Sequence, residues 1–323
     1  MQEMLEPRLA ENITSTDDLR EHCGAYVLSC HKVMTQDQEQ IAVHRVETAV
    51  ADAARPVVVL LHGAFTNRRF WMSRRGQGLA GCLAKSGYDV WILETRGHGA
   101  AVRSSRYRHW TARDVARQDI PAASDYIHQT TGGRPQSWIA HSYGGIYLMA
   151  SLSMGWLDQS RLSAAAIFGS QISEGQPYLN LRPLNWGIRA AISAYGRFPA
   201  TLFGLGNEDE PPGILNEALT WKSKGRWVSG QGEDYSRGLG RIIIPVLAVG
   251  GVADTMDPAT GCRAFWEMIG SRQKQFWLLG KEQGYCKDYG HVDMLVGRDA
   301  QREIWPRVLA WLNQHTDPGH RVQ

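Results

Sequence analysis

Short apolar runs alternate along the chain with longer stretches of mixed polarity, as in a protein built from strands and helices in turn. The runs "PVVVLLHG" (56–63) and "IIIPVLAVGG" (242–251) are almost wholly apolar, which is typical of strands buried on both faces of a sheet. Two earlier runs, at 25–33 and 40–48, predict a hairpin. Further strands are predicted at residues 88–95, 137–142, 163–170 and 274–281.

Helices are predicted between most of these strands, at residues 76–86, 111–131, 145–153 and 299–314. Thr111, with Asp114 three residues later, has the pattern of a capping box. Pro121 is expected to kink or split the helix that follows. The repeated alternation predicts an α/β fold, with a mainly parallel sheet, helices on both of its faces and the hairpin at one edge.

Residues 174–240 interrupt the alternation with a segment far longer than an ordinary connection between strand and helix. The segment is rich in aromatic residues, two of its stretches (186–196 and 213–224) look helical, and 206–213 is an acidic loop. Because so aromatic a segment can bury surface, we interpret it as a cap. The predicted domains are therefore a core, 1–173 and 241–323, and a cap, 174–240, inserted into it.

Composition and charge exclude several classes of protein. The 323 residues are 43% hydrophobic and 21% charged, and the net charge is +3, which gives no reason to expect nucleic acid as a partner. The N-terminal stretch lacks the apolar centre of a signal peptide, and no apolar run approaches the ~20 residues of a membrane span. The five cysteines are widely spaced. We therefore expect a cytoplasmic protein with reduced thiols.

Ser142 lies in "WIAHSYGGI", where a predicted strand meets a predicted helix. A nucleophile elbow needs small residues two places before and after its serine, because strand and helix nearly touch at the turn. Gly144 fills the later position and Ala140 the earlier one, where glycine is usual. The turn would expose the Ser142 hydroxyl and aim the Tyr143 amide at developing negative charge. An ordinary strand-to-helix turn is the alternative.

A second motif, His62-Gly63-Ala64-Phe65, directly follows the strand predicted at 56–63. Its glycine allows the chain to turn and to aim an amide above the sheet. We assign the Ala64 amide as an oxyanion donor, paired with that of Tyr143, and expect Phe65 to flank the pocket. A plain turn between strand and helix remains the alternative.

A serine nucleophile needs a base and a carboxylate that orients the base. His291, in the loop after the last predicted strand, is the best base. Asp254 and Asp257 both follow the strand at 242–251. Asp257 precedes Pro258 and reads as a helix N-cap, so we choose Asp254 as the acid, with Asp293 as a weaker option.

The order Ser142, Asp254, His291, with the His-Gly turn upstream, resembles the α/β-hydrolase superfamily over about residues 25–315. "GYDVWILETRGHG" is similar to a strand and loop of its esterases and lipases, and "HGAFTNRRFW" and "GHVDMLVGRDA" to its acid-lipase and bacterial-esterase branch. The resemblance implies the α/β-hydrolase fold, a Ser142-Asp254-His291 triad and an oxyanion hole at Ala64 and Tyr143. Ala140 departs from the usual glycine.

The expected function is hydrolysis of carboxylic esters through an acyl-enzyme. The same triad would serve a lactonase, thioesterase, amidase or acyltransferase, and a non-catalytic ligand-binding protein is an alternative of another class. We expect a small apolar ester or other acyl substrate, no cofactor and no metal; a homodimer is left open. The expected pocket residues are Phe65, His141, Trp186 and Trp221.

Overall fold

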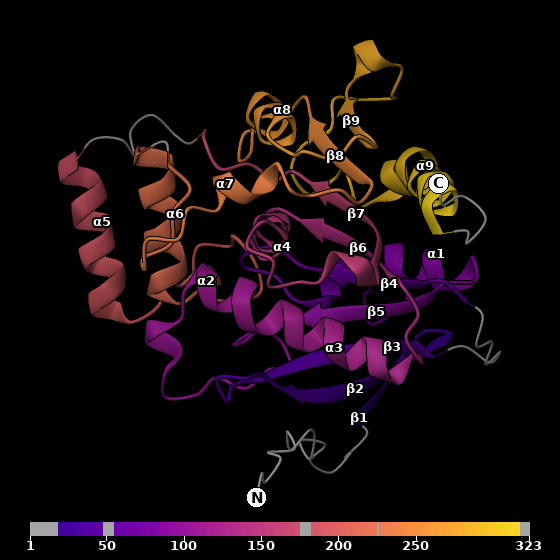
Figure 1. The fold of residues 1–323 in the computed structure, drawn as a ribbon, viewed down its shortest axis with the longest axis horizontal. Coiled ribbons are helices and arrows are strands. Elements are labelled where there is room, and N and C mark those ends of the chain that lie inside the picture. The colour runs from indigo at the N-terminus through magenta and orange to yellow at the C-terminus, as the bar shows by residue number, and fades with distance from the viewer. Residues whose placement is uncertain (1–18, 48–54, 175–181, 225, 317–323) are drawn as a thin grey trace, which may run out of the picture.

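A central sheet organises the molecule. The computed structural model describes residues 19–47, 55–174, 182–224 and 226–316, and within them one nine-stranded sheet has the order β1-β2-β3-β5-β4-β6-β7-β8-β9 (Figure 1). The strands are β1 (Leu19–Cys23), β2 (Tyr26–Met34), β3 (Gln40–Glu47), β4 (Val57–Leu61), β5 (Asp89–Glu94), β6 (Gln136–His141), β7 (Leu162–Phe168), β8 (Val246–Gly251) and β9 (Lys274–Leu279).

The sheet is antiparallel at one edge and parallel elsewhere. β1, β2, β3 and β5 pair antiparallel in succession, whereas β5, β4, β6, β7, β8 and β9 are parallel neighbours. The predicted hairpin is thus confirmed as β2 and β3, and the mainly parallel α/β fold is confirmed. β1 was not predicted: its sequence, LREHC, carries several polar residues and lacks the apolar run of a central strand.

Helices cover both faces of the sheet (Figure 1). They are α1 (Leu79–Lys85), α2 (Ala112–Asp114), α3 (Ile120–Thr130), α4 (Tyr143–Ser153), α5 (Arg182–Tyr195), α6 (Pro212–Lys224), α7 (Ser236–Leu239), α8 (Ala259–Glu267) and α9 (Arg298–Thr316). Side chains of α3, α4 and α8 pack on one face, and those of α1 and α9 pack on the other.

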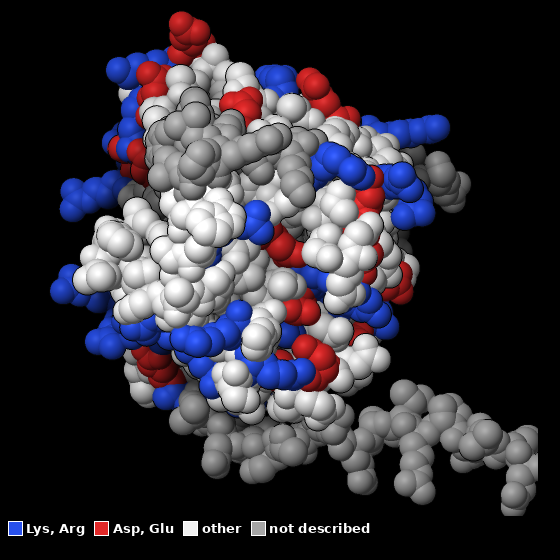
Figure 2. Space-filling view, turned by 90° about the vertical axis from the view of Figure 1, so that its left-hand side faces the viewer, with Lys and Arg blue, Asp and Glu red and all other residues white. Residues whose placement is uncertain are grey.

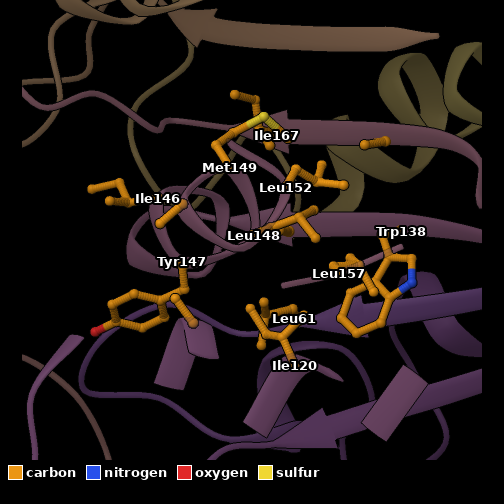
Figure 3. Packing of buried hydrophobic residues seen from close by; sticks show 14 of the residues in the cluster. Leu61, Ile120, Trp138, Ile146, Tyr147, Leu148, Met149, Leu152, Leu157 and Ile167 are labelled. Atoms are coloured by element: carbon orange, nitrogen blue, oxygen red, sulfur yellow. The ribbon is translucent and has the colours of Figure 1, made fainter. Parts of the chain in front are cut away.

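Alternate residues of the central strands supply the two cores. Val57, Val59 and Leu61 belong to the cluster beneath α3 and α4, while Val58 and Leu60 belong to the opposite cluster, because successive strand residues point to opposite faces. Figure 3 shows part of the first cluster, in which side chains of α4 gather with those of β4, β6 and β7, and Ile120 of α3 lies beside Leu61. Each of these five strand residues is fully buried, which accounts for the unbroken apolar run in the sequence.

The predicted helix at 111–131 is divided. Thr111 and Asp114 form the capping box that the sequence predicts. The chain then widens into a π-helical segment, Val115–Asp119, and resumes as α3, with Pro121 in the first turn. Proline has no N–H to donate to the preceding turn, and it comes just after the segment where the regular α-helical pattern is interrupted.

The connection between β7 and β8 carries α5, α6 and α7, and the pair α5 and α6 lies beside the sheet (Figure 1). The predicted cap, 174–240, spans this connection; residues 175–181 and 225 lie outside the described residues. Among the described helices, none combines the length and apolarity needed to cross a bilayer.

Candidate active site

Ser142 occupies the junction between β6 and α4. Its backbone has φ 53° and ψ −124°, which places a non-glycine residue on the left-handed side where side chains are strained. Its N–H donates to the Phe168 carbonyl at the end of β7 (2.7 Å), and only 7% of the residue is exposed. The serine is therefore held at the carboxyl ends of two adjacent parallel strands.

Close packing around the serine explains the small residues of both motifs. A Cβ at Gly63 would lie 2.8 Å from Ser142 Cβ, and one at Gly144 would lie 2.4 Å from the His62 carbonyl oxygen. A side chain at either glycine would thus press against the opposite turn. Ala140, the departure from the usual glycine, is fully buried in β6.

His291 and Asp254 face each other from the loops that follow β9 and β8. The His291 Nδ1–H donates to Asp254 Oδ2 at 2.8 Å, which leaves the Nε2 lone pair of a neutral ring as the basic position. Asp254 Oδ1 accepts the N–H groups of Met256 and Asp257, both at 2.9 Å. The carboxylate thus has donors on both oxygens.

Two contacts bring this pair to the serine. His141, which precedes Ser142, donates from Nε2 to the His291 carbonyl oxygen at 2.8 Å. Gly169, which follows Phe168, has φ 56°, and a Cβ there would lie 3.0 Å from His291 Nδ1 and 3.3 Å from Asp254 Oδ2. The end of β7 therefore touches the serine through Phe168 and the histidine and aspartate through Gly169.

His141 supports the His291 ring. Its own ring stacks on Phe70 at 4.4 Å and lies 4.6 Å from the ring of His291, between centroids. Burial, with the neighbouring His291, lowers the pKa of His141 to about 3. His141 is therefore neutral at physiological pH and adds no positive charge beside the His291 ring.

The N-cap interpretation of Asp257 is wrong. Helix α8 begins at Ala259, Pro258 holds the capping position, and no side chain caps the helix. The buried Asp257 carboxylate instead accepts from Gln171 Nε2 at 2.7 Å and lies 3.9 Å from His291 Nε2. Asp293, the third option, accepts from the Gly290 N–H and pairs with Lys287.

The His-Gly turn lies against the serine and is fixed at its first residue. His62 Nδ1–H donates to the Gly63 carbonyl at 2.8 Å, and the Thr95 N–H donates to His62 Nε2 at 3.3 Å. Burial, with the nearby His98, lowers the pKa of His62 to about 4, so the ring is neutral. Ala64 follows in the turn.

Tyr143 is the first residue of α4. The N–H groups of a first helical turn have no partner within the helix and carry its positive end. The Tyr143 amide is therefore suited to a negatively charged oxygen.

The expected pocket residues differ in their surroundings. The Phe65 ring packs against Phe198 at 5.5 Å between centroids. Trp186 lies on α5 and is 75% exposed, whereas Trp221 on α6 is buried and donates from its indole to the Val228 carbonyl. No hydrogen bond or ring contact recorded for the described residues joins either tryptophan to Ser142.

Sequence reasoning missed two residues at this site. Glu210, which was interpreted only as part of an acidic loop, accepts the Phe65 N–H at 2.8 Å. Gln171 was not considered, although it holds Asp257. Neither residue belongs to a motif, and Glu210 is 145 positions from its partner. Within the described residues, no group of three or more His, Cys, Asp and Glu that could hold a metal ion occurs.

Known proteins of similar sequence and structure include lipases and esterases. A probable lipase of Schizosaccharomyces pombe is 30% identical over 158 residues, covering 45% of this chain and 36% of the relative. Human gastric triacylglycerol lipase is 32% identical over 126 residues, covering 35% of this chain and 32% of the lipase. The chain thus spans about a third of the length of these relatives.

The fold extends over nearly the whole chain. The Pyrococcus furiosus esterase Pf2001 superposes with a TM-score of 0.58 and 17% identity, covering 96% of this chain and 99% of that one. Residues 58–304 match the sequence pattern of the alpha/beta hydrolase family. This match runs from β4 through the Ser142 turn and His291 into α9, and the chain therefore belongs to the alpha/beta hydrolase family.

Proposed function

We propose that this protein is a serine hydrolase that cleaves carboxylic esters through an acyl-enzyme. Ser142 is the nucleophile, His291 the general base and acid, and Asp254 the residue that orients His291. The Ala64 and Tyr143 amides form the oxyanion hole.

The observation that carries this proposal is the strained backbone of Ser142. A non-glycine residue at φ 53° persists only where its surroundings enforce it, and such strain gathers at functional sites. Two glycines fit closely on either side of the turn, and a hydrogen-bonded His–Asp pair touches the same strand end. An ordinary turn between a strand and a helix has no need of these features together.

The mechanism follows from the tautomer of His291. Because the His291 Nδ1–H is hydrogen-bonded to Asp254, Nε2 carries the free lone pair. It is able to take the proton of Ser142 as the hydroxyl oxygen attacks the ester carbonyl. The two backbone amides then stabilise the oxyanion, each by about 3 kcal/mol. His291 returns the proton to the leaving alcohol, and a water molecule repeats the cycle on the acyl-enzyme.

An apolar acyl group is the favoured substrate feature. In Figure 2, uncharged side chains cover much of the face that carries α5 and α6, with Lys and Arg toward its edges. In the loop that connects these helices, Leu202, Phe203 and Leu205 are each more than half exposed. The lipase relatives favour the same class of ester by analogy.

A chain-length series of p-nitrophenyl esters, from acetate to palmitate, tests this function. We expect turnover of at least one ester, with no added metal or cofactor, and its loss in Ser142→Ala. Failure of the wild-type protein to hydrolyse any ester, although a fluorophosphonate labels it, would favour a lactonase, thioesterase, amidase or acyltransferase. Absence of both turnover and labelling would favour a non-catalytic binding protein.

The free cysteines favour location in a reducing compartment such as the cytoplasm. All five cysteines are free, and Cys23, Cys30 and Cys262 are buried. Free buried thiols without a disulfide are usual in cytoplasmic proteins. Localisation of a tagged full-length chain would test this assignment.

A further inference from the structure

The acidic loop between α5 and α6 turns into the protein. Glu210 is fully buried. Its Oε1 accepts two hydrogen bonds, from the Phe65 N–H at 2.8 Å and from His98 Nε2 at 3.0 Å. One carboxylate oxygen therefore connects the loop after β4 to the loop after β5.

The residue that Glu210 holds has a strained backbone. Phe65 has φ 63°, which a bulky side chain rarely adopts. Its carbonyl accepts the N–H groups of Asn207 and Glu208, at 2.8 and 3.0 Å. Both polar backbone atoms of Phe65 are thus bound by the acidic loop, and these bonds keep the left-handed conformation in place.

This conformation determines where the Ala64 amide points. Gly63 lies against Ser142, since a Cβ there would be 2.8 Å from the serine Cβ. Ala64 is the one residue between this contact and the Phe65 N–H. With both neighbours fixed, the direction of the Ala64 N–H is fixed as well, and an oxyanion donor must be preorganised to be effective.

Stability alone is a poor explanation for a carboxylate at this position. Glu210 Oε2 is buried and has no hydrogen-bond partner among the described residues, which is unfavourable for folding. Burial opposes the charge of His98, but the charge and hydrogen bond of Glu210 raise the pKa of His98 to about 8. The His98–Glu210 pair therefore keeps its hydrogen bond, and the acceptor atom, Glu210 Oε1, also binds the Phe65 N–H.

We propose that Glu210 is a positioning residue for the oxyanion hole: by accepting the Phe65 N–H, it fixes the Ala64 amide in the orientation that binds the oxyanion. The inference rests on the proposed serine-hydrolase function. Glu210 acts through the turn and has no contact with the reacting atoms.

Three substitutions at Glu210 distinguish the effect of side-chain length from that of charge. Glu210→Gln keeps the side-chain length and an acceptor oxygen but removes the charge. Glu210→Asp keeps the charge on a shorter side chain, and Glu210→Ala removes both the length and the charge. The matched control is Asp209→Asn. Asp209 is a buried carboxylate of the same loop that binds Thr201 and Arg197, and it has no hydrogen bond to Phe65.

We expect Glu210→Ala and Glu210→Asp to lower kcat about tenfold to a hundredfold with little change in KM, since a lost oxyanion donor affects the transition state. Glu210→Gln and Asp209→Asn should remain within about threefold of the wild type. Glu210→Asp keeps the inference testable if Glu210→Ala does not fold. Thermal unfolding of every variant is measured alongside the kinetics, so that a loss of stability is distinguished from a loss of activity.

A trifluoromethyl ketone supplies a second readout. Ser142 adds to its carbonyl carbon, the proton passes to His291, and the former carbonyl oxygen becomes an oxyanion in the hole. Its dissociation constant should rise in Glu210→Ala and Glu210→Asp by the factor that kcat/KM falls. The dissociation constant of the corresponding secondary alcohol, which forms no adduct, should stay constant.

The outcomes distinguish the two proposals. If the wild-type protein forms the ketone adduct but Glu210→Asp and Asp209→Asn have equal kcat and equal affinity for the ketone, the positioning role of Glu210 is refuted while the proposed hydrolase function remains. If the wild-type protein neither hydrolyses esters nor forms the adduct, the proposed function fails and the inference fails with it.

Discussion

Replacing Asp254 with asparagine should reverse the tautomer of His291 while leaving the fold intact. Asp254 Oδ1 accepts two backbone N–H groups at 2.9 Å, and Oδ2 accepts the His291 Nδ1–H at 2.8 Å. Only the oxygen of an asparagine amide can replace Oδ1, so its NH2 group must face His291 Nδ1. The ring then accepts at Nδ1 and carries its proton on Nε2, where it cannot act as a base.

The expected loss in kcat is large because the base is disabled in every molecule. In Ser-His-Asp triads, a wrong tautomer lowers kcat about 10⁴-fold, which is about 5.5 kcal/mol in activation free energy. The assay is the hydrolysis of the best p-nitrophenyl ester. The two hydrogen bonds to Oδ1 survive, so the melting temperature should change little.

Asp257→Asn is the matched control, since it removes a buried carboxylate of the same site. Asp257 Oδ2 is 3.9 Å from His291 Nε2, too far for a hydrogen bond, so the tautomer is unaffected. We expect a loss of about tenfold or less. A greater loss in Asp257→Asn than in Asp254→Asn, or near wild-type kcat in Asp254→Asn, would refute the assignment of the acid.

Two further predictions test the packing and the buried charges. Gly63→Ala places a Cβ 2.8 Å from Ser142 Cβ and should lower kcat about a hundredfold, since misplacement by ~1 Å has that effect. The control, Gly187→Ala, lies on the exposed side of α5 with open space around it and should leave kcat unchanged. Equal kcat in the two variants would contradict the packing argument. Burial opposes the charge of His44, but its hydrogen bonds with Cys30 and Glu94 raise its pKa to about 9 from the ordinary 6.5. The protonated His44 with these partners therefore contributes about 3 kcal/mol to the free energy of unfolding below pH 6.5, and this contribution is lost as the pH rises through 9. Urea unfolding at pH 6.5 and 9.5 should show a smaller fall in the free energy of unfolding for His44→Gln than for the wild type, and equal falls would contradict it.

The central strands could be predicted because burial on both faces leaves a direct record in the sequence. Val57 to Leu61 are all fully buried, so no polar residue interrupts the run. β1 has a neighbour on one side only, and an edge strand tolerates residues such as Arg20 and Glu21. No apolar pattern therefore marked it.

The parts of the site that follow from local chemistry were also predictable. A serine between strand and helix and a glycine after a buried strand each restrict the backbone by sterics, and the structure has the close contacts that this argument requires. The roles of Ser142, Asp254 and His291 remain proposals. Their proximity depends on parallel strand ends that meet at one edge of the sheet.

The remaining features depend on contacts between distant segments. Asp257 followed by proline has the pattern of an N-cap, but α8 begins one residue too late for it, and the side chain turns to Gln171. Glu210 meets Phe65 across 145 positions. The burial of Trp221 and the exposure of Trp186 were likewise not predictable, because they depend on how each helix is rotated against its neighbours.

Covalent labelling of Ser142 tests the central claim most directly. The wild-type chain and Ser142→Ala are incubated with a fluorophosphonate, and the adduct is located by peptide mass spectrometry. The account predicts one adduct, on the peptide that contains Ser142, and an unmodified Ser142→Ala chain. An adduct on another residue, or equal labelling of the Ser142→Ala variant, would contradict it.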